Sequence, residues 1–176
     1  MINLNNPLPT CAARRIVPLT IEDSQRLKVL LELCSDFSML INGSPPGERG
    51  AEELLMDLPP GKSMDDKLVL GIETNGGELA GVIDLVKDYP EAGKLFIGLM
   101  LLAPSARGNG TGGVVLSDLE GWARKAGADK LGLGVLAHNL KGHHFWVQQG
   151  FQELQRKPPR LFGCLEGVVI VMEKNL

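Results

Sequence analysis

A glycine-rich segment between an expected strand and an expected helix constrains this chain more than any other feature. Residues 107–113 read Arg-Gly-Asn-Gly-Thr-Gly-Gly, after the apolar run Leu95–Leu102 and before an amphipathic stretch. Glycines allow a tight turn and a close approach of the backbone to a ligand. The start of the following helix leaves N–H groups without intrahelical partners, and phosphate oxygens are natural acceptors for them. The segment therefore predicts a strand–loop–helix unit that binds a phosphorylated molecule.

The strands before this loop follow one another closely. The runs Lys67–Glu73 and Glu78–Val86 are joined by Thr74-Asn75-Gly76-Gly77, a turn sequence that is typical of β-hairpins. A second turn, over Asp88–Gly93, leads into Leu95–Leu102. These three strands should form an antiparallel meander.

The helix after the loop predicts the one parallel pair in the sheet. Its apolar residues recur at helical spacing up to Gly127, a residue type that commonly follows a helix end, and Glu120 and Arg124 are expected on its solvent-facing side. If this helix is a right-handed crossover, the strand Lys130–Leu136 runs parallel to Leu95–Leu102.

The pattern as a whole is α+β, and we expect a single domain over residues 1–176 with an irregular N-terminal segment over residues 1–12. The other expected elements are a strand over Arg14–Leu19, a helix carrying Leu27, Leu30, Leu31 and Cys34 on its apolar face, a loop over Ile41–Arg49, a helix over Ala51–Leu58, a helix over Leu140–Gln149, and strands over Phe151–Arg156 and Gly167–Glu173 separated by a Pro158-Pro159 loop.

Composition narrows the class of protein. The chain has 176 residues, 44% of them hydrophobic, and a net charge of −3, which argues against a general surface for nucleic acid or anionic membranes. Neither a signal peptide nor a membrane-spanning run is recognisable, so we expect a cytoplasmic protein. Cys11, Cys34 and Cys164 are odd in number and widely spaced, which indicates reduced thiols, with Cys34 in the core and no metal site.

Gly108, Gly110 and Gly113 also satisfy the dinucleotide-binding pattern G-x-G-x-x-G, so an oxidoreductase must be considered. Such a site needs an acidic residue near the end of the next strand, and here that strand is followed by Ala137-His138-Asn139. The antiparallel meander before the loop is also wrong for that fold. A dinucleotide-dependent oxidoreductase is therefore the weaker alternative.

Two spaced motifs together resemble the GNAT family, the GCN5-related N-acetyltransferases. Arg107-x-x-Gly110-x-Gly112 matches the family's acetyl-CoA signature, and Asn139 followed by Phe145-Trp146-Val147-Gln148-Gln149-Gly150-Phe151 is similar to its second signature. The order of elements from Arg14 to Glu173 matches as well. The resemblance implies a mixed, mostly antiparallel sheet of about seven strands, with helices on both faces and the fourth and fifth strands splayed apart.

The resemblance also implies acetyl-CoA as co-substrate, with no metal. Backbone N–H groups of the glycine loop would bind the pyrophosphate, the open edge of the fourth strand would pair with the pantetheine arm, and Asn139 would bond its amides. The implied coenzyme-binding residues are Met100, Leu101, Leu102, Arg107, Gly108, Asn109, Gly110, Thr111, Gly112, Gly113, Asn139 and Trp146.

The family's usual proton-transfer residues do not carry over. Its Glu on the fifth strand and its Tyr in the second signature correspond here to Gly134 and Trp146, and neither can transfer a proton. Asp84 and Tyr89 are the candidates to replace them, although a polar strand face and a turn aromatic are simpler readings of the two. We expect direct attack by the amine in a ternary complex, without an acyl-enzyme.

His143 and His144 are further candidates for proton transfer, because histidine commonly carries protons, but both also suit a solvated helix face. The resemblance leaves a non-catalytic acyl-CoA-binding module open as a second function.

The acceptor is expected to be a primary amine, on a small molecule or on a protein. Its pocket should lie between the loop over Ile41–Arg49, the turn over Asp88–Gly93 and the segment over Lys157–Glu166. The carboxylates of Glu48, Asp88 and Glu91 would suit a cationic acceptor, and equally suit solvated loops. Edge strands of such a sheet can pair between subunits, so a homodimer stays open.

Overall fold

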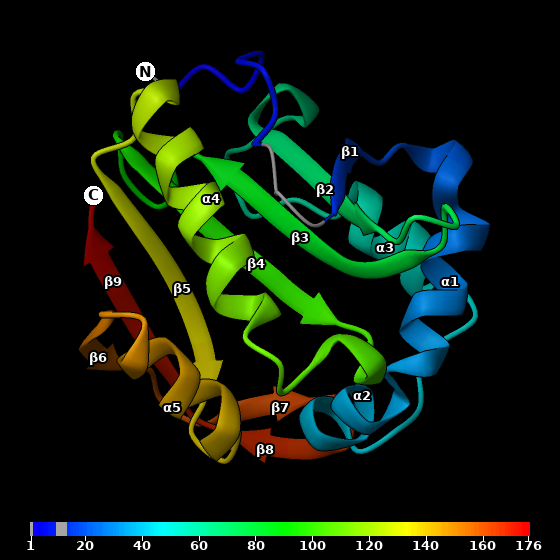
Figure 1. Cartoon of the computed structure of the whole chain (residues 1–176). Helices are drawn as coiled ribbons and strands as arrows, with labels where there is room; N and C mark the ends of the chain where they lie inside the picture. The colour runs from blue at the N-terminus through cyan, green and yellow to red at the C-terminus, as the bar shows by residue number, and fades with distance from the viewer. Residues whose placement is uncertain (1, 10–13) are drawn as a thin grey trace.

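The computed structural model describes residues 2–9 and 14–176. Its centre is a seven-stranded sheet with the order β1-β2-β3-β4-β5-β9-β6 (Figure 1). Adjacent strands are antiparallel, except that β4 and β5 are parallel. The expected sheet is confirmed. Its strands are β1 (Arg15–Pro18), β2 (Lys67–Glu73), β3 (Leu79–Lys87), β4 (Lys94–Leu102), β5 (Lys130–Leu136), β6 (Gln152–Arg156) and β9 (Val169–Asn175).

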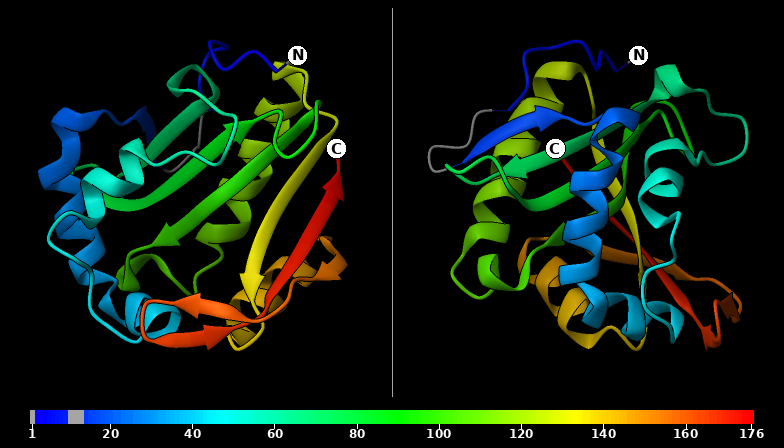
Figure 2. Two further views of the ribbon diagram at one scale, coloured as in Figure 1. Left: turned by 180° about the vertical axis from the view of Figure 1, so that it is seen from behind. Right: turned by 90° about the vertical axis from the view of Figure 1, so that its right-hand side faces the viewer.

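Helices cover both faces of the sheet (Figures 1 and 2). On one face, α4 (Thr111–Ala126) and α5 (Leu140–Gln148) bury apolar residues against β2 to β5 and β9. On the other face, α1 (Ser24–Leu33) and α3 (Gly50–Met56) form a second core over β2 to β4, and α2 (Ser35–Asn42) adds Phe37 to it. Short 3₁₀ turns η1 (Ile21–Asp23), η2 (Met64–Asp66) and η3 (Pro104–Ala106) precede α1, β2 and the glycine loop.

The strands β4 and β5 separate partway along their length. They pair only where Lys94–Ile97 lie beside Lys130–Leu133, and beyond that point they diverge into the V visible in Figure 1. On the other side of β4, Leu85 pairs with Ile97 and Asp84 with Leu99, so Gly98 is an extra, bulged residue. The expected splay is confirmed, and it begins at the bulge.

Two expected loops contain regular structure. The segment Ile41–Arg49 begins as the last turn of α2, which ends at Asn42 before Gly43 in the left-handed conformation (φ 71°). The segment Lys157–Glu166 contains most of a hairpin of β7 (Arg160–Phe162) and β8 (Leu165–Gly167). This hairpin packs against the end of α2, where Cys164 N–H donates to the carbonyl of Asn42 at 2.8 Å. Both expectations of an irregular loop are wrong in these parts.

The expected solvent-facing position of Glu120 is also wrong. Glu120 is 9% exposed, and its carboxylate accepts a hydrogen bond from the ammonium of Lys174 on β9 at 2.5 Å. The guanidinium of Arg124 lies 3.8 Å from the same carboxylate. Lys174 is 54 residues distant in sequence, so helical spacing alone could not reveal this burial.

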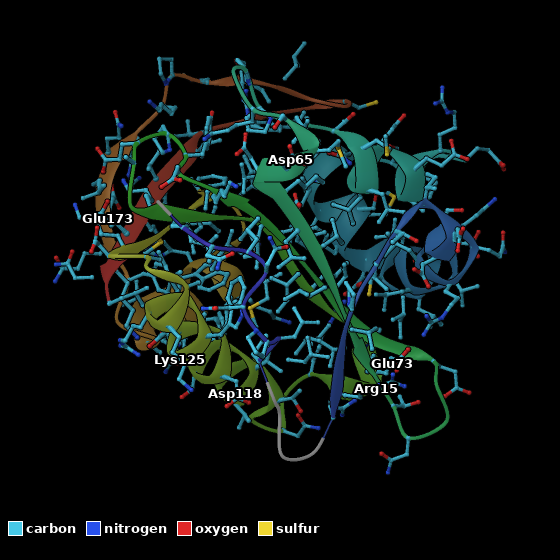
Figure 3. The ribbon with its side chains drawn as sticks, turned by 90° about the horizontal axis from the view of Figure 1, so that it is seen from above. Arg15, Asp65, Glu73, Asp118, Lys125 and Glu173 are labelled. Atoms are coloured by element: carbon cyan, nitrogen blue, oxygen red, sulfur yellow. The ribbon has the colours of Figure 1, made fainter. Side chains whose placement is uncertain are left out.

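An ion-pair network fixes the outer edge of the sheet. Glu73 at the end of β2 accepts a hydrogen bond from Arg26 of α1 at 2.6 Å, and Arg15 of β1 lies 3.7 Å away (Figure 3).

The N-terminal segment, residues 2–9, contains neither helix nor strand, yet Ile2 is buried in the core under α4. Cys11, expected to be a reduced thiol, lies outside the described residues.

Candidate active site

The glycine loop turns the chain from β4 into α4 through left-handed backbone conformations. Gly108 and Gly110 have φ of 75° and 83°, a region that other residues enter only at a cost. Gly110 is the residue immediately before α4. A Cβ added at either glycine would meet no atom within 4 Å, so both face open space.

The loop presents a row of unused backbone donors. Thr111 N–H donates to the side-chain oxygen of Asn109 at 3.2 Å, and Arg107 N–H donates to Pro104 at 3.3 Å. The first turn of α4 contains no acidic residue that would repel an anion. Within residues 2–9 and 14–176, no protein acceptor receives the amide N–H groups of Gly108, Asn109, Gly110, Gly112 or Gly113. Convergent donors at a helix start fit a diphosphate.

The Arg107 side chain is used inside the protein. Its Nε donates to the carbonyl oxygen of Leu102 at 2.8 Å, and its Nη2 lies 3.2 Å from the carboxylate of Asp36 on α2. The hydrogen bond from Arg107 lowers the pKa of Asp36. The guanidinium therefore fixes the end of β4 and the loop relative to α2.

Cys34 lies beside that contact. Its thiol is 1% exposed and donates to the same Leu102 oxygen at 3.4 Å, and burial raises the pKa of the thiol. These are the properties of a core cysteine, as the sequence indicated.

Beyond the bulge, β4 has no strand partner on its β5 side in the described part of the chain. The side chains of Met100 and Leu102 pack towards the core under α4, and that of Leu101 packs into the core under α1 and α3. Only the backbone of this segment can therefore face the V, which is the arrangement that pairing with an extended ligand requires.

The second motif packs against the first. Trp146 is 9% exposed and makes edge-to-face contacts with Phe145 and Phe151, at ring-centroid distances of 4.9 and 5.1 Å. A Cβ at Gly112 would lie 3.2 Å from the Phe145 ring, so this glycine lets α4 and α5 approach closely. Asn139 caps α5 by accepting the N–H of Gly142 at 3.0 Å. Its Oδ1 therefore has a structural role as helix cap, and no described residue accepts from its Nδ2.

A cavity of roughly 340 Å³ lies on the opposite face of the sheet, between α1 to α3 and β2 to β4. Its inner lining includes Leu99 and Leu101 of β4, Lys67 of β2 and Asp84 of β3. The rest of the lining is Leu31, Cys34, Phe37, Ser38, Ile41, Asn42, Pro46, Gly47, Gly50, Glu53, Leu54 and Asp57. Of the three segments expected to surround the acceptor, Ile41–Arg49 contributes to this lining, and neither the turn Asp88–Gly93 nor the segment Lys157–Glu166 does.

Asp84 is the charged group nearest the bulge. It is 8% exposed, and its Oδ1 accepts a hydrogen bond from Lys67 Nζ at 2.7 Å. Its Oδ2 lies 2.5 Å from the point where a Cβ of Gly98 would be, so the absence of a side chain at Gly98 makes room for the carboxylate. Burial raises the pKa of Asp84, and the hydrogen bond from Lys67 opposes part of that increase.

The other candidates lie elsewhere. Tyr89 is in the turn between β3 and β4, at the end of β4 opposite the glycine loop, and its ring packs edge-on to Phe96 at 5.4 Å. It does not line the cavity. His143 and His144 lie on α5, and neither lines the cavity.

The three carboxylates expected to attract a cation are engaged in local contacts. Glu48 pairs with Lys28 at 3.3 Å and Glu91 with Lys94 at 3.0 Å, while Asp88 accepts the N–H of Gly93 at 2.8 Å. The cavity carboxylates are instead Glu53, Asp57 and Asp84. Sequence reasoning missed Lys67. The available signal was its diagonal position in the expected meander, two residues before Val69, which pairs with Asp84.

Two further observations limit the site. A second cavity, of roughly 550 Å³, lies between Asn6–Pro9 and the outer side of α4, and none of the predicted site residues lines it. In the part of the chain that the structure describes, no three His, Cys, Asp or Glu side chains gather as a metal ion would require, and no helix is both long and apolar enough to span a bilayer.

The splayed parallel pair of strands, with unpaired backbone donors at its open end and a cavity across the sheet, is the arrangement that the two sequence motifs implied. The model of the acetyltransferase (GNAT) family matches residues 38–151. The chain therefore belongs to the GNAT acetyltransferase family, as the two motifs predicted.

Solved structures agree with this fold. An acetyltransferase from Thermus thermophilus superposes with a TM-score of 0.78 and 21% identity, over 94% of this chain and 99% of the other. The GNAT domain of S. lividans PAT gives 0.67 and 19%, over 93% and 90%. A Klebsiella pneumoniae protein described as an acyl-CoA N-acyltransferase gives 0.62 and 21%, over 93% and 97%. No curated protein matches the sequence.

Proposed function

We propose that this protein transfers an acetyl group from acetyl-CoA to a primary amine by direct attack. One observation carries the proposal: the open edge of β4 and the cavity containing Asp84 meet at the Gly98 bulge. A donor laid along β4 and an amine in the cavity would thus converge on one point. This convergence is what an effectively intramolecular reaction needs.

The donor side is assigned to backbone groups. The free amides of Gly108, Asn109, Gly110, Gly112 and Gly113 would bind the pyrophosphate, and the edge of Met100 to Leu102 would pair with the pantetheine arm. Asn139 can offer Nδ2 to an amide carbonyl while its Oδ1 caps α5. Acetyl-CoA supplies the thioester carbonyl, which a β4 backbone N–H near the bulge would polarise.

The acceptor side is assigned to Asp84 in preference to Tyr89, because only Asp84 lines the cavity. Its carboxylate attracts the substrate ammonium and takes the first proton, directly or through water. The amine nitrogen then bonds to the carbonyl carbon as the carbon–sulfur bond breaks, and the second amine proton ends on the released thiol. Trp146 stands where the family has a tyrosine, and its packing between Phe145 and Phe151 supports a role in shaping the V.

The second candidate is a non-catalytic acyl-CoA-binding module, favoured by Gly134 and Trp146 at the usual acid–base positions. The oxidoreductase alternative has little support, since β1 to β4 are antiparallel and a dinucleotide fold needs a doubly wound parallel sheet. Thermal melts with CoA and with NAD(P), followed by a free-thiol assay over a panel of amines, separate the three. The proposal expects stabilisation by CoA alone and amine-dependent thiol release.

A further inference from the structure

The cavity that would receive the amine has an uneven distribution of charge. Three carboxylates and one ammonium line it, so its lining is net negative. Asp84 and Lys67 are buried at the sheet, where Lys67 is the one described side chain that hydrogen-bonds Asp84. Glu53 and Asp57 are exposed and therefore lie at the mouth.

One of the two carboxylates at the mouth is placed against the electrostatics of its helix. Asp57 is the C-cap of α3, where the helix dipole disfavours an anion, whereas Glu53 lies in the first turn, where the dipole favours one. Within residues 2–9 and 14–176, neither has a cationic side chain within 4.0 Å. An arrangement that costs stability and lines a cavity is typical of a functional site.

Between mouth and floor, the cavity wall is mostly apolar, with Ser38 and Asn42 of α2 as its polar side chains. Leu31 and Leu54 come from α1 and α3, and Phe37 and Ile41 come from α2. Such a wall favours a hydrocarbon stem.

We propose that the acceptor is an aliphatic amine with a second cationic group at the far end of its stem. The reacting ammonium would lie at Asp84 beside Gly98, the stem against the apolar wall, and the second cation between Glu53 and Asp57. This inference rests on the proposed function, because it assigns the cavity to the acceptor of that reaction.

The test measures binding to the full-length protein saturated with CoA, by calorimetry. Three probes share one stem: 1,5-diaminopentane, 1-aminohexane and 6-aminohexanoate, which end in a cation, a methyl group and a carboxylate. The diamine should bind about fivefold more tightly than 1-aminohexane, since each exposed ion pair contributes up to about fivefold. The aminohexanoate should bind most weakly.

Single substitutions test whether Glu53 and Asp57 cause the preference for the diamine. Glu53→Gln and Asp57→Asn should each reduce the advantage of the diamine by about twofold to fivefold. Glu52→Gln is the matched control, because it removes the same charge from the same helix at a residue that pairs with Arg49 at 3.2 Å and does not line the cavity. It should leave the advantage intact.

Equal binding of the diamine and 1-aminohexane would overturn the inference, as would an equal loss in Glu52→Gln. Thiol release with the diamine and with 1-aminohexane at equal kcat/KM would also overturn the inference, although it would support the proposed function. The expected binding pattern without thiol release from any amine would support the inference about the cavity and refute the proposed reaction.

Discussion

Arg107 donates its Nε–H to the carbonyl oxygen of Leu102 at 2.8 Å, which ties the glycine loop to the end of β4. The same guanidinium meets Asp36 on α2. The residue that begins the glycine loop thus acts as a brace between the loop, β4 and α2. Its side chain has a structural role that the motif alone does not indicate.

The brace predicts coupled effects on stability. Arg107→Gln should lower the free energy of unfolding by about 1–2 kcal/mol through loss of charged hydrogen bonds. Asp36→Asn should cost only about 0.5 kcal/mol, because its side chain is 61% exposed and the pair is screened by solvent. In the double variant the Asp36 change should add almost nothing. Urea unfolding of the four proteins measures this, and fully additive losses would show that the contact is not energetically significant.

A substitution in the glycine loop should lower the affinity for CoA without a large loss of stability. Gly110→Ala places a Cβ in open space but at φ 83°, a conformation that costs roughly 1–2 kcal/mol for a non-glycine residue. Relief of that strain should redirect the loop amides and weaken CoA binding about tenfold, which is about 1.4 kcal/mol. Calorimetric titration with CoA checks this.

The control for that variant is Gly121→Ala in the interior of α4, where a Cβ meets nothing within 4 Å. Alanine there should be neutral or stabilising by up to about 1 kcal/mol. Unchanged CoA affinity in Gly110→Ala would count against the loop as the phosphate site.

A side chain at Gly98 in the bulge should reduce both stability and activity. Gly98→Ala would bring a Cβ to 2.5 Å from Asp84 Oδ2, so the carboxylate or the bulge must move. We expect a loss of roughly 1–3 kcal/mol in stability and a fall in kcat/KM. Thermal melts and steady-state kinetics, again beside Gly121→Ala, measure both; full activity in Gly98→Ala would remove the reason to place the reaction there.

The ionisation of Asp84 predicts the acid limb of the pH–rate profile. Burial raises its pKa above the ordinary value of 3.8, so the carboxylate becomes protonated, and kcat/KM falls, at a higher pH than for an exposed aspartate. Lys67 opposes that increase, so Lys67→Met should move the limb to still higher pH. Asp84→Asn should abolish the limb and lower kcat/KM about 100-fold or more.

Because breaking a buried ion pair is destabilising, folding of both variants must be verified by circular dichroism. An unchanged acid limb in a folded Asp84→Asn protein would exclude Asp84 as the proton acceptor.

Much of this architecture could be predicted because local patterns and long-range packing agree. The strands Lys67–Glu73 and Lys130–Leu136 have the expected bounds, and the Asn75-Gly76 turn joins its two strands as expected. The motif residues lie together at the open end of the V because β4 and α4 are consecutive. Here sequence neighbours are also spatial neighbours.

The parts of the structure that the sequence did not predict depend on contacts between residues that are distant in the chain. The helix α2 is short and is braced by Arg107, which is 71 residues away from Asp36. The hairpin of β7 and β8 has strands of three residues next to two prolines, too short for a periodic signal. The carboxylates at the mouth of the cavity could be predicted only from the position of α3 over the sheet, and no local sequence pattern determines that position.

The measurement that tests the account most directly is thiol release from acetyl-CoA with and without a primary amine. The account predicts release that requires the amine, yields equal amounts of acetylated amine and free CoA, and weakens in Asp84→Asn. Binding of acetyl-CoA without amine-dependent release, over a panel that includes 1,5-diaminopentane, would contradict it and identify the protein as an acyl-CoA-binding module.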